Sequence, residues 1–177
     1  MSPKPYPPFE MGTNDLVLIQ DYDPTWPGVF SKLAARVRSG LGGLLLTVEH
    51  IGSTAVPGLA AKPIIDLDVV LVSAADLPEA IRLLAAIGYV HEGDLGIPGR
   101  EAFRCPPGEP RHHLYVLTGG AKELRRHLAF RDALRASEDL RNKYAALKRL
   151  LAEAQTDDRS AYTKSKESFI AAVIDIA

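Results

Sequence analysis

The chain has 177 residues, of which 46% are hydrophobic and 24% are charged, and its formal net charge is −1. This composition is typical of one folded globular domain and excludes a disordered, collagen-like or coiled-coil chain. The longest apolar stretch, residues 63–72, is broken by Asp66 and Asp68, so no segment is predicted to span a membrane. The near-neutral charge gives no overall field that would attract nucleic acid or anionic lipid.

The cysteine content and the first residues indicate where the protein is found. Cys105 is the single cysteine, so it has no partner in the chain for a disulfide or a zinc knuckle. Four prolines fall within the first eight residues, where a signal peptide would have a basic stretch followed by an apolar one. We therefore expect a cytoplasmic protein with an extended Pro-rich arm over residues 1–15 and a single domain over residues 16–177.

The first predicted elements are a strand and a helix. Residues 16–19 form a short apolar run typical of a strand. Asp23 followed by Pro24 provides an N-cap and a first-turn proline for a helix that should end near Gly40. Runs rich in β-branched residues then predict further strands over 44–51, 64–72, 89–92, 101–105 and 112–118.

Helices are predicted between and after these strands. Asp76 and Glu79 have the spacing of a capping box, and they open a helix that Gly88 closes. Apolar residues recur at helical spacing from Leu140 to Ala154 and again from Tyr162 onwards. The expected fold is α/β (α+β), a mixed sheet flanked by helices with a helical C-terminal region, and its strand order is left open.

The strongest predicted strand carries two acidic residues. Side chains alternate along a strand, so Asp66 and Asp68 lie on one face, about 6 to 7 Å apart. Two buried carboxylates this close destabilise each other unless a cation neutralises them. With only two carboxylates, and room left for water and phosphates, the pair suits Mg²⁺ or Mn²⁺. The alternatives are a solvated sheet face or a pair matched by arginines.

A Gly/Pro loop, residues 52–58, directly precedes this strand. Gly52 allows close backbone approach, and the hydroxyls of Ser53 and Thr54 can donate to phosphate oxygens. A Walker A loop is excluded, because Gly58 is not followed by Lys and Ser or Thr. Lys62, held extended by the next proline, is the best candidate for a further phosphate contact. A plain connector between strands is the alternative.

Basic residues are concentrated in residues 121–150, with nine lysines and arginines against four acids. Arg131 lies on the apolar stripe of its helix and needs a partner, while the adjacent Asp132 projects elsewhere. Lys166 also lies on an apolar stripe, where it either extends to solvent or enters an anion-binding cleft. We count Arg131 and Lys166 among the candidate phosphate-binding residues. With 7% aromatic residues and no basic-aromatic interleaving, a small anionic partner is favoured over nucleic acid.

These motifs together resemble a known signature. Gly52-Ser53, a twelve-residue spacer and Asp66-Leu-Asp68 are similar to the polymerase-beta-like nucleotidyltransferase superfamily. More narrowly, residues 49–59 and 61–68 resemble the GrpB family, also called UPF0157, as do Tyr144 and Lys148 further along. The resemblance implies a nucleotidyltransferase fold in which the Gly-Ser turn holds a nucleotide and the aspartates bind metal. Similar domains fused to dephospho-CoA kinase imply a role related to nucleotides or coenzyme A.

The chain departs from this signature at one position. The superfamily's third carboxylate lies on a later strand, and the equivalent segment here, residues 111–116, has no acid. His113 and Tyr115 share a face of this strand, and His113 is either a ligand or proton acceptor at the site or a core histidine satisfied by backbone. The leading hypothesis is a metal-dependent nucleotidyltransferase with Asp66, Asp68 and His113 as its catalytic residues. A binding module without catalysis and an interaction domain are the alternatives.

Overall fold

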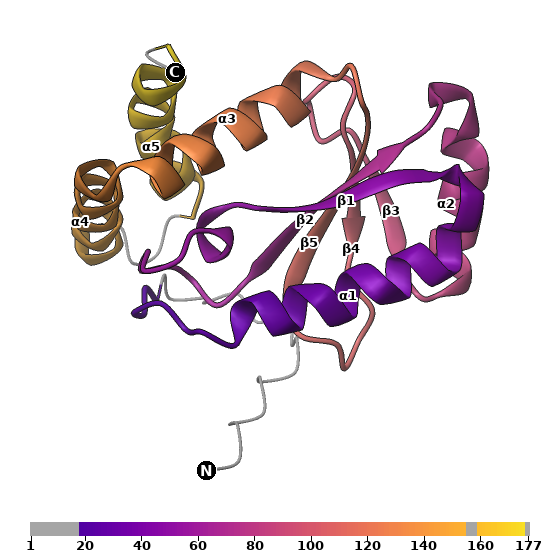
Figure 1. Cartoon of the computed structure of the whole chain (residues 1–177), viewed down its shortest axis with the longest axis horizontal. Helices are drawn as coiled ribbons and strands as arrows, with labels where there is room; N and C mark the ends of the chain where they lie inside the picture. The colour runs from indigo at the N-terminus through magenta and orange to yellow at the C-terminus, as the bar shows by residue number, and fades with distance from the viewer. Residues whose placement is uncertain (1–17, 155–158, 176–177) are drawn as a thin grey trace.

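The computed structural model describes the backbone of residues 18–154 and 159–175, and the side chains of residues 18–153 and 166–175. The expected N-terminal arm lies outside these residues. Within them, a five-stranded mixed sheet is combined with five α-helices, which confirms the predicted fold class (Figure 1). No helix in this part of the chain is long and apolar enough to cross a bilayer.

The strands lie in the order β1-β2-β5-β4-β3. Only β2 and β5 run parallel, and the other neighbouring pairs are antiparallel. In the parallel pair, Asp66 lies beside His113 and Asp68 lies beside Tyr115. The two central strands therefore place these four side chains on one face of the sheet. The strand bounds are Leu45–Ile51, Ile65–Leu71, Val90–Gly93, Glu101–Arg104 and His112–Thr118 for β1 to β5.

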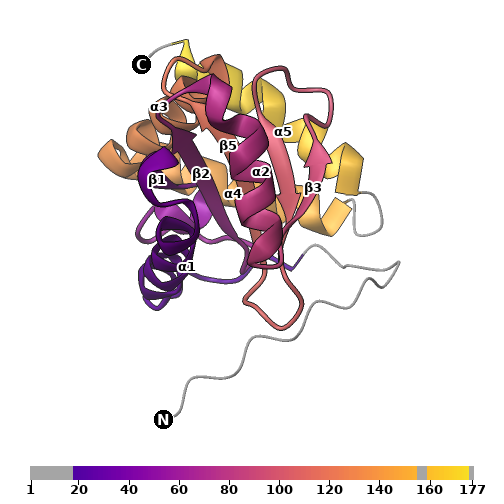
Figure 2. The same ribbon diagram turned by 90° about the vertical axis from the view of Figure 1, so that its right-hand side faces the viewer.

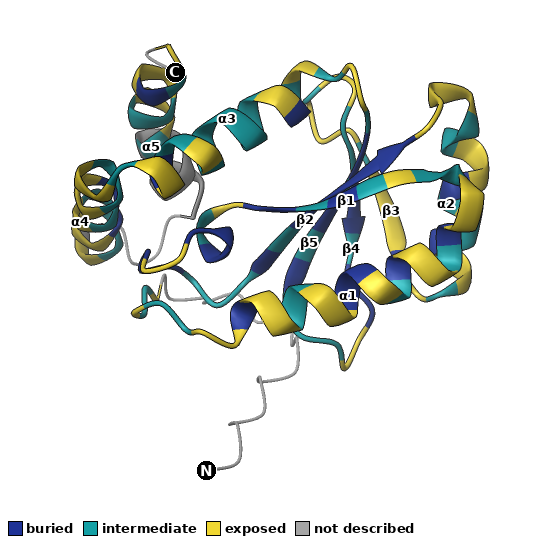
Figure 3. Cartoon of the chain, viewed as in Figure 1, coloured by how far each residue is buried: buried dark blue, intermediate teal, exposed yellow. Residues whose placement is uncertain are grey.

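One face of the sheet forms the main core against α1 (Trp26–Leu41) and α2 (Leu77–Ala86). The apolar residues that alternate with the aspartates, such as Leu67 and Val69, are completely buried on this face, as is Trp26 of α1. Figure 3 shows that β2 and β5 are largely buried, while β3 and the outer side of α1 are exposed. Burying a side chain of this size stabilises the fold by about 1.5–3 kcal/mol, so this face holds the sheet together.

The opposite face carries the aspartates and is covered by the C-terminal helices α3 (Lys122–Ala136), α4 (Glu138–Ala154) and α5 (Arg159–Ile174). Figures 1 and 2 show α3 across the sheet from α1, with α4 and α5 beyond the loop that joins β1 to β2. One apolar cluster joins α3 to the sheet, and a second joins all three helices to that loop. The buried members of these clusters are Val70, Leu117 and Leu124 in the first, and Val56, Leu59, Leu134 and Tyr144 in the second. The aspartates lie between them.

Two predictions at the start of the chain are wrong. Of the strand predicted over residues 16–19, residues 16 and 17 lie outside the described residues and residues 18 and 19 form no strand; instead Gln20 makes an isolated bridge to Ala61. The first helix begins at Trp26 rather than at the expected first-turn proline, because Asp23 Oδ1 accepts a hydrogen bond of 2.8 Å from the N–H of Thr25 and closes a local turn.

The predicted capping box is also wrong. Asp76 makes no side-chain cap, and Glu79 pairs with Arg82 one turn further along the helix. Ser73 takes over the capping role, accepting from the N–H of Ala75 at the start of a short 3₁₀ turn. The spacing that suggested a capping box served an i,i+3 ion pair instead.

Candidate functional site

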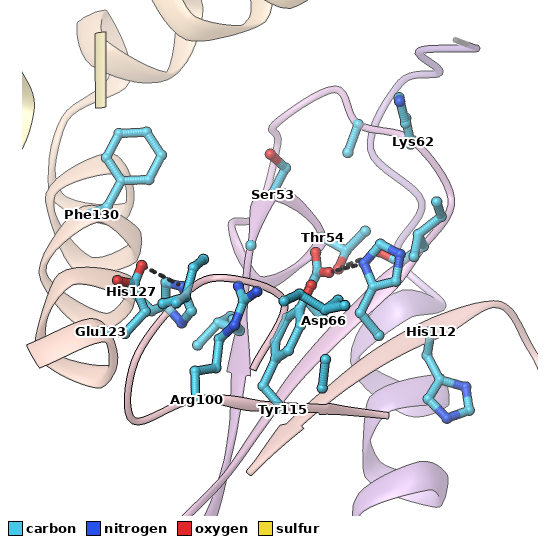
Figure 4. Close-up of a pocket in the computed structure, with 18 of the residues that line it drawn as sticks. Ser53, Thr54, Lys62, Asp66, Arg100, His112, Tyr115, Glu123, His127 and Phe130 are labelled. Carbon is cyan, nitrogen blue, oxygen red and sulfur yellow. Dashed lines mark hydrogen bonds and ion pairs between the residues drawn. The ribbon is translucent and has the colours of Figure 1, made fainter. Parts of the chain in front are cut away.

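A pocket of about 710 Å³ opens on the aspartate face, between the β1–β2 loop, β5 and the C-terminal helices (Figure 4). Asp68 and Arg131 do not line it. It does bring together most of the residues selected from the sequence, namely Gly52, Ser53, Thr54, Lys62, Asp66, His113 and Lys166.

The turn after β1 lies directly against Asp66. Gly52 has φ +70° and ψ −173°, a conformation almost restricted to glycine. A Cβ on Gly52 would lie 2.2 Å from Asp66 Oδ2, so only glycine fits at this close approach. The exposed backbone of the predicted phosphate turn and the first predicted metal ligand are therefore neighbours.

His50 contacts this turn through Thr54. Its Nε2 lies 3.0 Å from Thr54 Oγ1, and the Thr54 hydroxyl donates onward to the carbonyl of Ile64 at 3.4 Å. The ring of Phe30 stacks on His50 at 4.5 Å. Burial lowers the pKa of His50 to about 4, so the neutral ring donates to Thr54. The Thr54 hydroxyl, predicted as a phosphate ligand, is therefore engaged with the protein and positions the turn.

A buried cation, Lys148 of α4, contacts the turn; it shares the family resemblance but was not among the predicted site residues. Lys148 is 2% exposed. Its ammonium donates to Ser53 Oγ at 3.0 Å and to the carbonyl of Ala60, and it lies 4.7 Å from the centre of the Tyr144 ring. Burial lowers the pKa of Lys148 to about 7, with nearby Lys166 and Arg149 adding to the shift. The available signal was its spacing, one helical turn after Tyr144, which puts Lys148 next to the predicted apolar stripe.

Asp66 and His113 form a pair that faces the pocket. His113 Nδ1 donates to Asp66 Oδ1 at 2.7 Å. His113 thus contacts a carboxylate at the pocket, whereas the description of a histidine satisfied by backbone fits the neighbouring His112. That buried ring donates to the carbonyl of Pro110 at 2.6 Å and accepts from the hydroxyl of Tyr89 at 2.8 Å.

Asp68, by contrast, is completely buried beneath α3. Its Oδ2 accepts from His127 Nδ1 at 2.7 Å, while its Oδ1 has no hydrogen-bond partner. His127 Nε2 in turn lies 3.3 Å from Glu123 Oε1, as Figure 4 shows. Burial raises the pKa of Asp68, and the contact with His127 opposes the shift. Both aspartates are thus held by histidines rather than arginines, and nothing in the local sequence connected His127 or Glu123 to them.

The donor set bears on the predicted metal. Among the described residues no group of three or more His, Cys, Asp or Glu side chains is arranged to hold an ion. Mg²⁺, however, is commonly bound by one or two carboxylates, with water and substrate phosphates completing its shell. Asp66 lines the pocket, and the buried Oδ1 of Asp68 has no hydrogen-bond partner, so these two carboxylates are the ones that a substrate-completed Mg²⁺ or Mn²⁺ site would use. The described residues do not form a metal cage made by protein alone.

The remaining basic candidates differ in position. Arg131 donates to Glu49 Oε2 at 3.0 Å and to Asp132 Oδ1 at 2.7 Å, so it ties α3 to β1. The expectation that Asp132 projects elsewhere is wrong, because the guanidinium reaches its carboxylate along the helix surface. Lys62 and Lys166 are half-buried and line the pocket, as expected for phosphate contacts.

More distant similarities concern the fold and parts of longer proteins. The structure of Cid1 in complex with its short product ApU aligns with a TM-score of 0.52 at 13% identity, covering 75% of this chain and 41% of that one. This likeness supports a nucleotidyltransferase fold. The dephospho-CoA kinase of Mycolicibacterium paratuberculosis is 29% identical over 171 residues, which cover 82% of this chain and 42% of that enzyme.

Closer matches identify the family. The family model described as GrpB protein matches residues 16–175. A UPF0157 protein of Halalkalibacterium halodurans is 39% identical over 160 residues, covering 89% of this chain and 80% of that protein. The crystal structure of the conserved protein GrpB from Enterococcus faecalis aligns with a TM-score of 0.82 at 35% identity, covering 90% of this chain and 96% of that one. The fold, the Gly-Ser turn and the aspartate strand agree with these matches, and the chain belongs to the GrpB family.

Proposed function

We propose that this protein is a metal-dependent nucleotidyltransferase-like enzyme that acts on a nucleotide and a small acceptor. The observation that carries the proposal is the contact between Gly52 and Asp66. A phosphate held by the exposed backbone of this turn stands beside the carboxylate that would share its metal ion. Neither a plain connector nor a solvated acidic face requires so close an approach.

The nucleotide phosphates bind at the turn. The backbone of Gly52 and the hydroxyl of Ser53 supply donors, and Lys148 supplies positive charge through its contact with Ser53. Lys62 and Lys166 line the same pocket and add charge around the phosphates. This concentration of cations in a pocket of about 710 Å³ favours a small anionic ligand.

Asp66 and Asp68 would hold Mg²⁺ or Mn²⁺, which when bound neutralises charge that develops on the phosphates. The chain's own residues orient the reactants and move the proton. The acceptor hydroxyl oxygen forms a bond to the α-phosphorus, the bond from that phosphorus to the bridging oxygen breaks, and pyrophosphate leaves. Because His113 donates from Nδ1 to Asp66, its Nε2 is the basic nitrogen that takes the hydroxyl proton.

Turnover tests this proposal. Purified protein is incubated with each nucleoside triphosphate, Mg²⁺ and a panel of hydroxyl acceptors, and released pyrophosphate is measured. Asp66→Asn and Asp68→Asn are each expected to abolish release, while Asp76→Asn, which alters an aspartate that caps nothing, leaves it intact. Circular dichroism and thermal melting establish that each variant is folded. Equal pyrophosphate release by wild type and both site variants would refute the assignment.

A second candidate function is a binding module that retains the turn without catalysis. Two observations favour it: β5 places His113 and Tyr115 beside the aspartates where an acid is expected, and Asp68 is completely buried. The similarity to part of a dephospho-CoA kinase makes coenzyme A precursors suitable ligands to test beside nucleotides. Thermal stabilisation by one of these ligands, with no turnover in the screen, supports this function over the first.

The location of the protein is also a proposal. The one cysteine, Cys105, is buried and has no disulfide. A single unpaired thiol is in keeping with a reducing compartment, and we propose the cytoplasm.

A further inference from the structure

The pocket extends past Asp66 into a region that the phosphate turn does not use. Figure 4 shows Arg100 and Tyr115 on the opposite side of Asp66 from Ser53 and Lys62. This region is formed by β5 and by the loop between β3 and β4, residues 94–100. A second reactant that approaches the bound phosphates would enter from this side.

Arg100 is held in this region by an aromatic ring. Its guanidinium carbon lies 4.3 Å from the centre of the Tyr115 ring. Its Nε is buried without a hydrogen-bond partner. A buried N–H without an acceptor is unfavourable, and stacking on the ring orients the guanidinium without using its donors. Arg100 thus presents an oriented set of donors to the pocket.

The same loop supplies an apolar edge. Leu95 and Ile97 both line the pocket, and Leu95 is 61% exposed with a φ of +48°, in the left-handed region that a leucine rarely adopts. Asp94 fixes this conformation, because its Oδ1 accepts from the N–H of Gly96 at 2.8 Å and its carbonyl accepts from the N–H of Ile97 at 3.0 Å. The loop therefore holds apolar surface next to Arg100.

We propose that this end of the pocket binds a ligand that combines an oxyanion, a carboxylate or a phosphate, with an apolar portion. The fork of Arg100 matches the oxygens of either group, and Leu95 and Ile97 cover the apolar portion. The identification of this ligand as the acceptor rests on the proposed function. Its chemical class rests on Arg100, Tyr115 and the loop alone.

The test uses the full chain without nucleotide or metal. Hexyl phosphate, hexanoate and hexanol are titrated separately, and binding is followed through the ¹H–¹⁵N resonance of the Arg100 Nε and through loop amide shifts. One or both anions are expected to bind at least tenfold more tightly than hexanol, and the preferred anion distinguishes phosphate from carboxylate. Arg100→Met is expected to weaken anion binding at least tenfold, and Arg100→Lys to weaken it less, because lysine keeps the charge but loses the fork.

Two controls separate the alternatives. Arg82→Met removes an exposed arginine outside the pocket and should leave binding of the anions unchanged. Leu95→Ser should weaken the binding of hexyl phosphate and hexanoate more than the binding of inorganic phosphate or formate. Equal binding by wild type and folded Arg100→Met or Arg100→Lys, hexanol as tight as the anions, or no anion binding up to the solubility limit overturns the proposal. If Asp66→Asn leaves nucleotide turnover unchanged while the probes still bind, the nucleotidyltransferase function is refuted. The proposed ligand class is then retained.

Discussion

Substitution of Gly52 by alanine tests the contact on which the proposed function depends. The new Cβ would lie 2.2 Å from Asp66 Oδ2 and 3.0 Å from Asp66 Cγ. Ordinary contacts begin near 3.4 Å, so the carboxylate must move by about 1 Å. The backbone at φ +70° and ψ −173° adds about 1–3 kcal/mol of strain for a residue that carries a Cβ.

We expect Gly52→Ala to lower the free energy of unfolding by about 2–4 kcal/mol and the melting temperature by about 5–15 °C. Because a displacement of about 1 Å in a site costs roughly 10²-fold in rate, turnover should fall by about that factor. Urea denaturation measures the first effect and pyrophosphate release measures the second.

Gly58→Ala is the matched control, because Gly58 also has a positive φ, +80°, but has no atom within 4 Å of the position of a Cβ. It should lose only about 1–2 kcal/mol of stability, with turnover retained. In the double variant Gly52→Ala/Asp66→Ala the contacts with Asp66 Oδ2 and Cγ are absent and only the milder approach of 3.1 Å to the Cβ of residue 66 remains, so the two substitutions should cost less together than the sum of their separate effects. Equal losses for Gly52→Ala and Gly58→Ala, with additive energies in the double variant, would refute the steric argument.

Three further predictions follow from the pKa shifts and ion pairs of the site. Burial lowers the pKa of His50 to about 4, while this side chain titrates near 6.5 in the unfolded chain, so between these values protons bind mainly to the unfolded state. The free energy of unfolding should therefore fall by up to about 3 kcal/mol as pH drops from 6.5 to 4. Unfolding curves of His50→Gln should lack this pH dependence. Burial lowers the pKa of Lys148 to about 7, so this side chain loses its charge as pH rises through 7. Nucleotide affinity, measured by calorimetric titration, should therefore weaken over that range. Lys148→Met should bind nucleotide weakly at every pH. Arg131→Gln should lower stability by about 1–3 kcal/mol by leaving Glu49 without its partner, and an unchanged melting temperature combined with lower nucleotide affinity would contradict the structure.

Local patterns in the sequence were sufficient to predict much of the site. The alternation of β2 placed Asp66 and Asp68 on one face, because side chains alternate along any strand. Gly52 was predicted to let a phosphate approach the backbone closely, which stays a prediction, and the structure shows that the Asp66 side chain also requires a glycine at this position. The same alternation predicted that His113 and Tyr115 share one face of β5, and both line the pocket.

The sequence by itself therefore determined the fold class, the face that carries the aspartates and the turn beside them, since each follows from the local geometry of a strand or a turn. Tertiary packing alone decided the rest. It buried Asp68 under His127, paired Arg131 with Glu49, and brought Lys148 into contact with Ser53, ninety-five residues away in the sequence. The physical reason is that desolvation and pairing of a charge depend on which helix covers it, and the placement of α3 and α4 is set by apolar contacts with the distant β1–β2 loop and the sheet, which no short pattern records.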